Sequence, residues 1–264
     1  MPGTWRTHIR CCRETLYRYR SSLEERIHHM TRKQLRICYR IITILSLCAG
    51  CYFSLKETTS VKALLSYYTL QSNLICLAAF VIYVILELRG NEYRNRFYYF
   101  SKGGITMAII ITMLVYHAAL VSADFEMDAL QKSIADRLLA DAFVHTISPL
   151  FVIGDYLLLD EKGKMKYYYP ALWLIVPLLY VVYVYSYGTL GGRFFNIGGS
   201  ERFAYFFLDY TQIGAKAVAV WILGIAALIF AMSEGLVLLD RNLPKRLALQ
   251  RATLHLVKSS RRPW

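Results

Sequence analysis

Acidic residues and cysteines are scarce in this chain, and their distribution excludes two classes of protein. The 264 residues include 18 Asp and Glu against 31 Lys and Arg, and charged residues make up only 19%. No cysteine follows Cys76, so the later loops cannot hold a disulfide framework. The single CxxC pair, Cys48 and Cys51, has no second pair to complete a zinc site, and no HExxH pattern occurs. A disulfide-rich secreted domain and a zinc-motif protein are therefore excluded.

Hydrophobic residues, by contrast, make up 56% of the chain and occur in blocks long enough to cross a bilayer. Each block is close to the roughly 20 residues that a membrane helix needs, and none shows the alternation of a β-barrel strand. The sequence predicts an all-α fold, a polytopic bundle of six transmembrane helices. The predicted spans are 36–56, 63–88, 103–122, 138–159, 168–188 and 212–239.

Lys and Arg are placed unevenly, and their placement predicts the topology. They crowd the two ends of the chain and the connections 89–102 and 160–166. By the positive-inside rule these four segments are cytoplasmic, and an even number of spans agrees, because it puts both ends on one side. We therefore predict a basic cytoplasmic arm over 1–35, a transmembrane domain over 36–240 and a basic cytoplasmic tail over 241–264.

The net charge of +13 bears on the partners of the protein. On a chain this apolar, topology and attraction to anionic lipid headgroups account for the excess of basic residues. Charge alone is a weak signal for nucleic acid. We therefore expect a multi-pass protein of the cell membrane whose partners are membrane lipids and not nucleic acid.

One polar stretch stands at the outer end of the second span. "YYTLQSNLI", residues 67–75, carries Thr69, Gln71, Ser72 and Asn73 where a membrane helix usually has apolar residues. Helical spacing puts Ser72 and Asn73 on the face of Thr69 and turns Gln71 away from it.

Other polar residues are predicted to lie in the same layer of the membrane. Thr69 and His145 each lie about seven residues inside their spans, or about 10 Å at 1.5 Å per residue. Asp141 precedes His145 by one turn, His117 ends the third span, and Asp209 precedes the last. An ionisable residue within a span suggests a function by default, so this outer layer is the predicted site.

The inner half of the predicted spans contains fewer polar residues. We expect Glu87, Asp155, Glu234 and Asp240 to stand nearly alone there. A solute carrier needs polar groups along its whole path, so this distribution favours a site confined to the outer half.

The outer layer holds the groups needed for acyl transfer. His145 is the predicted general base, because the ordinary pKa of histidine lies near neutrality. Thr69 can supply the hydroxyl nucleophile, while Asp141 or Asp209 could orient the imidazole ring. Asn73, Gln71 or a tyrosine could stabilise an oxyanion.

The same residues also have structural explanations. A Thr in a span often bonds back to the carbonyl of residue i−4, and Ser, Asn and Gln often join neighbouring helices. A metal site built from His117, His145 and an Asp is not supported by any ligand spacing, so we expect no metal.

Three motifs resemble those of a known family. "YYTLQSNLI" from Tyr67, "HTISPLFVIGDYLL" from His145 and "YFFLDYTQIG" from Tyr205 resemble, in order and spacing, the motifs of bacterial Pr6Pr membrane proteins. The same landmarks are similar to those of the animal androgen-induced-gene family. Members of that family are six-span membrane hydrolases that use a Thr nucleophile and a His base on fatty-acid esters of hydroxy fatty acids. The resemblance covers roughly 36–240.

Carried over to this chain, the resemblance implies Thr69 as nucleophile and His145 as base. Asp155 follows His145 by ten residues, about 15 Å along a helix axis, so we expect it to pack at the inner end rather than orient the ring. Phe206 stands where the family usually has Pro. The further candidates for orienting or oxyanion groups are Asn73, Ser72, Asp141, Asp209, Tyr205 and His117.

Two functions follow from these observations. The first is an intramembrane hydrolase of lipid esters, in which His145 takes the proton of Thr69, an acyl-threonine forms, and water releases it. The alternative is a non-catalytic lipid-binding protein or small-solute carrier that uses the same polar cluster. Neither function calls for a cofactor.

Overall fold

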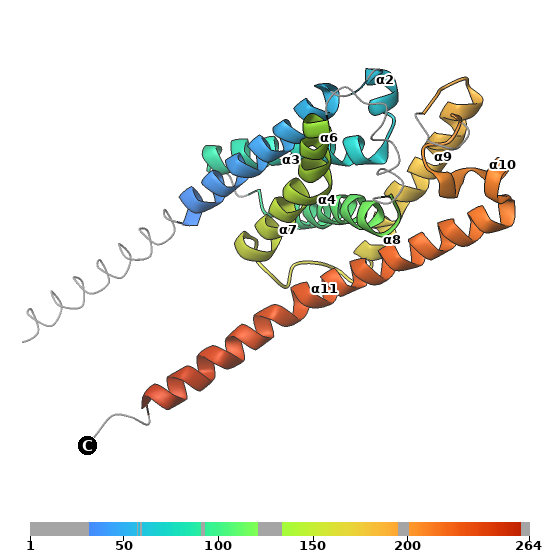
Figure 1. Ribbon diagram of the computed structural model, residues 1–264. Helices are drawn as coiled ribbons and strands as arrows, with labels where there is room; N and C mark the ends of the chain where they lie inside the picture. The colour runs from blue at the N-terminus through green and yellow to red at the C-terminus, as the bar shows by residue number, and fades with distance from the viewer. Residues whose placement is uncertain are drawn as a thin grey trace, which may run out of the picture.

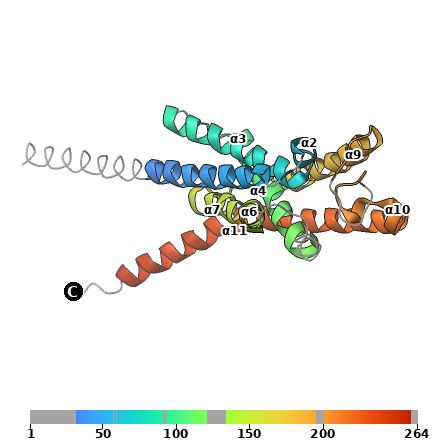
Figure 2. The ribbon, with the colours of Figure 1, turned by 45° about the horizontal axis from the view of Figure 1, so that its top comes forward.

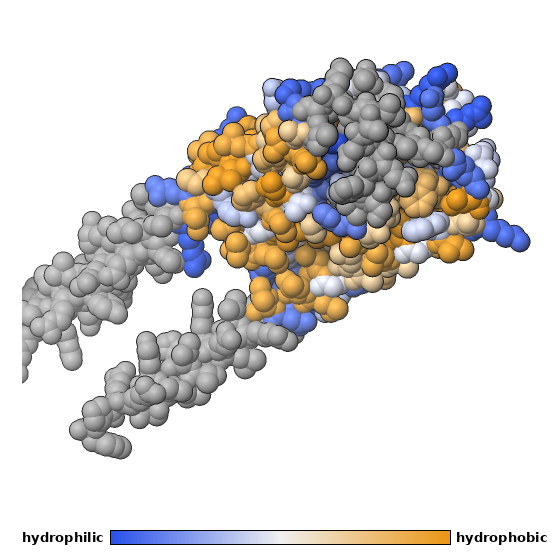
Figure 3. All heavy atoms as spheres, viewed as in Figure 1, coloured by the Kyte–Doolittle hydropathy of each residue, from blue (hydrophilic) through white to orange (hydrophobic). Residues whose placement is uncertain are grey.

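The described part of the chain is a bundle of six apolar helices without a strand (Figure 1). The computed structural model describes residues 32–56, 58, 60–90, 93–120, 134–194 and 201–259. Hydrophobic residues cover most of the visible side of the bundle (Figure 3). The predicted fold class is therefore confirmed. The helices long and apolar enough to span a membrane are Arg32–Lys56, Tyr68–Arg89, Arg96–Leu120, Ala135–Leu159, Tyr169–Thr189 and Ala215–Leu243.

Several of these spans are built from shorter elements with short breaks or π-helical turns between them. After the first span the order is α2 (Val61–Leu64), α3 (Tyr68–Arg89), α4 (Arg96–Val115), η1 (Tyr116–Leu120), α6 (Ile134–Ala142), η2 (Phe143–Ile147), α7 (Ser148–Leu159), α8 (Tyr169–Trp173), α9 (Ile175–Thr189), η3 (Phe206–Leu208), α10 (Tyr210–Ile213) and α11 (Ala215–Ser259). The start of the first span and the end of α11 lie toward one side of the bundle (Figures 1 and 2).

The second span begins later than its apolar composition suggests. Ser60 caps the short helix α2, and a turn separates α2 from α3, which begins only at Tyr68. Thr69 therefore lies in the first turn of its span rather than about seven residues inside it. At the other end Gly90, at φ 70°, terminates α3.

Two other predicted boundaries shift by several residues. The third span begins at Arg96, because the Asn95 side chain accepts a hydrogen bond from the Tyr98 N–H and caps α4 before its apolar run. The sixth begins at Ala215 and continues as one helix to Ser259, past the predicted end at 239.

A proline shapes the fourth span at its candidate histidine. Pro149 has no N–H to donate to the carbonyl of His145, four residues earlier. The Ser148 N–H instead bonds to the carbonyl of Phe143, five residues back, which is the π-helical pattern of η2. Such turns recur at functional sites.

Buried charges join the inner ends of the first four spans. The Arg40 guanidinium is fully buried and lies 3.1 Å from Asp155, 3.4 Å from Asp160 and 3.5 Å from Glu87. The Lys102 ammonium, also fully buried, lies 2.5 Å from Asp155 and 3.8 Å from Asp160. Asp155 thus packs at the inner end, as predicted.

The predicted isolation of the inner acidic residues is wrong for three of the four. Glu87 also pairs with Arg36 and Arg94, and Asp240 accepts a hydrogen bond of 2.9 Å from the Tyr156 hydroxyl. Of the basic partners, Arg36 and Arg40 lie at the start of the first predicted span, and Arg94 and Lys102 lie in the predicted connection 89–102. Only packing shows that they turn inward, into the bundle.

We predict that Lys102→Met will lower the free energy of unfolding by about 3–5 kcal/mol, because it removes one partner of a buried ion pair. The matched control is Lys56→Met. Lys56 is 51% exposed where it pairs with Asp136, so its loss should cost less than about 1 kcal/mol. Denaturant unfolding in detergent micelles measures both, and equal losses would contradict the importance of the buried network.

Candidate functional site: an outer cavity with hydroxyl groups at one end

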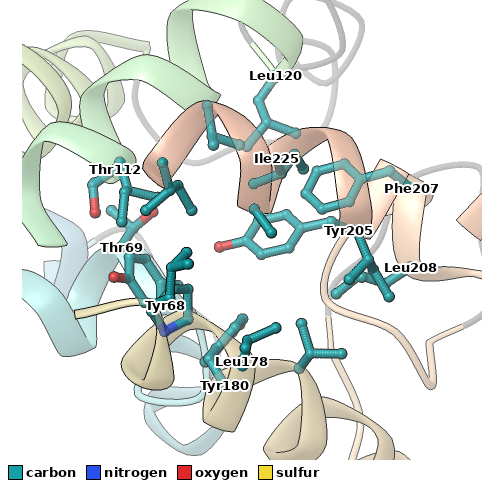
Figure 4. Close-up of a pocket in the computed structure, with 18 residues that line it drawn as sticks. Tyr68, Thr69, Thr112, Leu120, Leu178, Tyr180, Tyr205, Phe207, Leu208 and Ile225 are labelled. Atoms are coloured by element: carbon teal, nitrogen blue, oxygen red, sulfur yellow. The ribbon is translucent and has the colours of Figure 1, made fainter. Parts of the chain in front are cut away.

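A cavity lies in the outer half of the bundle, beneath the loop that precedes the sixth span (Figure 4). It contains about 710 Å³ of empty space, its open mouth included. Apolar side chains from α4, α9, η3 and α11 line most of it.

A break in the fifth span forms one wall of this cavity. Pro177 cannot donate to the carbonyl of Trp173, and the helix is interrupted at Leu174, between α8 and α9. Leu174, Pro177 and Leu178 all line the cavity. α11 packs against α8, whereas α9 and α11 diverge beyond it (Figures 1 and 2). The cavity occupies the space between them.

Hydroxyl groups gather at one end of the cavity. They belong to Thr69 and Tyr68 of α3, Thr112 of α4, Tyr180 of α9 and Tyr205 of the outer loop. The Tyr205 phenol points toward Thr69 (Figure 4). The phenol lies beside the Thr69 side chain and the backbone N–H groups of Tyr68 and Thr69, whereas the Tyr180 hydroxyl donates to the Ser66 carbonyl at 3.2 Å. The Tyr68 hydroxyl is buried without a hydrogen-bond partner.

Tyr205 is a neutral donor at this site. Burial raises the pKa of Tyr205 above its ordinary value. The phenol therefore keeps its proton at neutral pH and can donate it to an oxygen of a ligand.

Ser72 and Asn73 fasten α3 to its neighbours beside Thr69. The Ser72 hydroxyl donates to the Thr69 carbonyl at 2.9 Å and lies 2.7 Å from the Thr112 hydroxyl. The Asn73 amide donates to the carbonyls of Thr69 at 2.8 Å and Val144 at 3.2 Å. Asn73, rather than Thr69, is thus level with η2, and Thr69 lies about 6 Å nearer the outer side.

Gln71 points away from this face, as predicted. Its amide donates to the Leu65 carbonyl at 3.1 Å, in the turn before α3. Ser72 and Asn73, by contrast, are fully buried.

His145 lies behind the wall of the cavity rather than in its lining. Its ring stacks on Tyr116, with ring centroids 3.7 Å apart and an interplanar angle of 8°. One ring nitrogen bonds to the backbone of Thr112, and Nδ1 is buried without a partner. Neither nitrogen is hydrogen-bonded to Thr69, so the catalytic pair stays a prediction.

The other candidate residues hold local structure. The His117 ring lies 3.0 Å from the Thr146 hydroxyl. Asp141 pairs with Arg137 at 3.6 Å. Asp209 caps α10 by accepting from the Thr211 N–H at 3.0 Å. Among the described contacts, the ring of His145 is bonded to neither aspartate. Within the same part of the chain no three His, Cys, Asp or Glu residues converge on a metal site.

Sequence reasoning missed Thr112 and Tyr180. Thr112 stands alone in an apolar run, and Tyr180 is one of many tyrosines in the fifth span. In the sequence, the only feature that marks these two residues is a hydroxyl group in the outer half of a span, and many other residues have the same feature.

Comparisons of the chain with protein-family models, with curated proteins and with solved structures each found no match. The motif resemblance therefore remains a hypothesis, and the function has to be argued from the site itself.

We predict that Asn73→Ala will lower the free energy of unfolding by about 1–2 kcal/mol, because it frees two buried carbonyls at the contact between α3 and η2. Gln71→Ala, two residues away, should cost less than about 0.5 kcal/mol. Unfolding in detergent micelles compares the two variants. A larger loss for Gln71→Ala would mean that the turn before α3, and not this contact, holds the site together.

Proposed function

We propose that this protein binds a membrane lipid, with one acyl chain in the outer cavity and the lipid's polar group at Thr69. The observation that carries the proposal is the division of the cavity lining. Its hydroxyl groups lie at one end, while Leu178, Ile225 and other apolar side chains form the rest. A lipid has the same division between a polar group and a hydrocarbon chain.

The surroundings of the cavity favour a ligand that arrives from the bilayer. On the outer side Phe207 and Leu208 line the cavity and pack with Phe194 and Phe203 in one apolar cluster. Leu178 is 44% exposed on the lipid-facing side of α9 and also lines the cavity. The space between α9 and α11 is therefore the natural path for an acyl chain.

Ester hydrolysis is a second candidate, favoured by the position of the Thr69 hydroxyl inside the cavity. The Thr69 oxygen would attack the ester carbonyl, the alcohol would leave with the proton taken from Thr69, and water would then release the fatty acid. Tyr205 would donate to the carbonyl oxygen as charge develops on it. His145 could accept the proton at Nδ1 once its ring has moved toward the cavity.

We predict that Leu178→Trp will weaken lipid binding at least about tenfold, because the larger side chain fills the space for an acyl chain. Leu179→Trp is the matched control, since Leu179 is 61% exposed and does not line the cavity. The measurement is displacement of a fluorescent acyl lipid from purified protein. Equal binding by the two variants would place the lipid elsewhere.

For hydrolysis, we predict that Thr69→Val and His145→Ala each lower turnover of a long-chain ester at least about 100-fold. Thr69→Val should still hold the acyl chain, because Tyr205 and the apolar lining are unchanged, and Thr69→Ser should retain turnover. A fluorophosphonate probe should label Thr69 in the unmodified protein. If the purified protein hydrolyses no long-chain ester, hydrolysis is wrong and the binding proposal still stands.

A further inference from the structure

In the part of the chain that the structure describes, tyrosine is the only ionisable residue type in the lining of the outer cavity. Among the described residues, the 18 that line it include no Lys, Arg, His, Asp or Glu. Its polar groups are the hydroxyls of Thr and Tyr. Hydroxyls can satisfy a neutral carbonyl or alcohol, but they cannot neutralise an ion.

The nearest fully buried cation along α4 is distant and already paired. Lys102 precedes Thr112 by ten residues, about 15 Å along the helix axis. Its ammonium is held by Asp155 at 2.5 Å. His145 stacks on Tyr116 and is not among the residues that line the cavity. Among the described residues that line the cavity, an ionised group bound at Thr69 would therefore find no counterion, which is strongly unfavourable in a buried site.

The start of α3 does not compensate for the missing cation. The N-terminus of a helix normally offers free N–H groups to an anion. Here the Tyr205 phenol lies against the backbone N–H groups of Tyr68 and Thr69 and competes with an anion for them. The polar end of the cavity thus presents hydroxyls rather than the anion site that a helix start would otherwise form.

We propose, resting on the lipid-binding function above, that the lipid's polar group at Thr69 is uncharged. It is the ester or alcohol of a neutral acylglycerol, and neither a phosphate nor a free carboxylate. This ligand differs from the substrate that the motif resemblance implies, because a fatty-acid ester of a hydroxy fatty acid carries a free carboxylate.

The test compares two lipids that differ by one phosphate. Full-length protein in non-ionic detergent is loaded with a fluorescent monoacylglycerol, which is then displaced by monooleoylglycerol or by its phosphate ester. We expect the phosphate ester to bind at least about tenfold more weakly. Equal or tighter binding of the phosphate ester overturns the inference but leaves lipid binding intact. Failure of the probe and of both competitors to bind overturns the proposed function, and the inference with it.

A charge placed in the cavity should reverse this selectivity. Leu120 lies at the outer end of the third span and lines the cavity. A lysine at this position can extend its long side chain into the cavity without a large change of the backbone. Leu120→Lys should tighten binding of the phosphate ester at least about tenfold. Ala118→Lys, at an exposed position outside the lining, should change nothing. If Leu120→Lys still binds the neutral lipid but gains nothing for the phosphate ester, the missing counterion does not set the selectivity.

Discussion

The pairing of Asp155 with Arg40 and Lys102 is the interaction on which the rest of the bundle depends. The three side chains come from the first, third and fourth spans. Glu87, in the second span, joins them through its ion pair with Arg40. A bilayer offers no water to these groups, so each charge must meet its partner inside the protein. That requirement fixes how far each helix is rotated about its axis. With α3 and α4 fixed in this way, Ser72 and Thr112 meet at the opposite end of the same helices.

Two prolines give the outer half its shape. Pro149 sets the π-helical turn that holds His145 against Tyr116. Pro177 interrupts the fifth span, so that α9 turns away from α11 and leaves a cavity between them. These two breaks place His145 behind the wall of the outer cavity and leave the hydroxyl groups at one end of the cavity itself. Binding of a lipid requires only the cavity, whereas ester hydrolysis also requires the ring of His145 to move.

Sequence reasoning succeeded where the pattern is local. Blocks of apolar residues gave the six spans, and helical spacing separated the face of Ser72 and Asn73 from Gln71. Reasoning failed where an end depends on a cap or a turn, as at Tyr68, and where charges meet across helices, as at Arg40 and Lys102. Basic residues near a span end look alike in sequence, whether they point toward headgroups or into the bundle.

What the sequence by itself determined is the number of membrane helices and the kinds of chemical groups in the outer half, because helix rise and rotation per residue are nearly constant. Only the tertiary structure decided which of those groups meet. Tyr205 reaches Thr69 from a loop far along the chain, and Asn73 rather than Thr69 lies level with the turn that carries His145. The physical reason is that tilt, rotation and breaks between helices are set by buried ion pairs, prolines and side-chain packing, which have no fixed spacing along the chain.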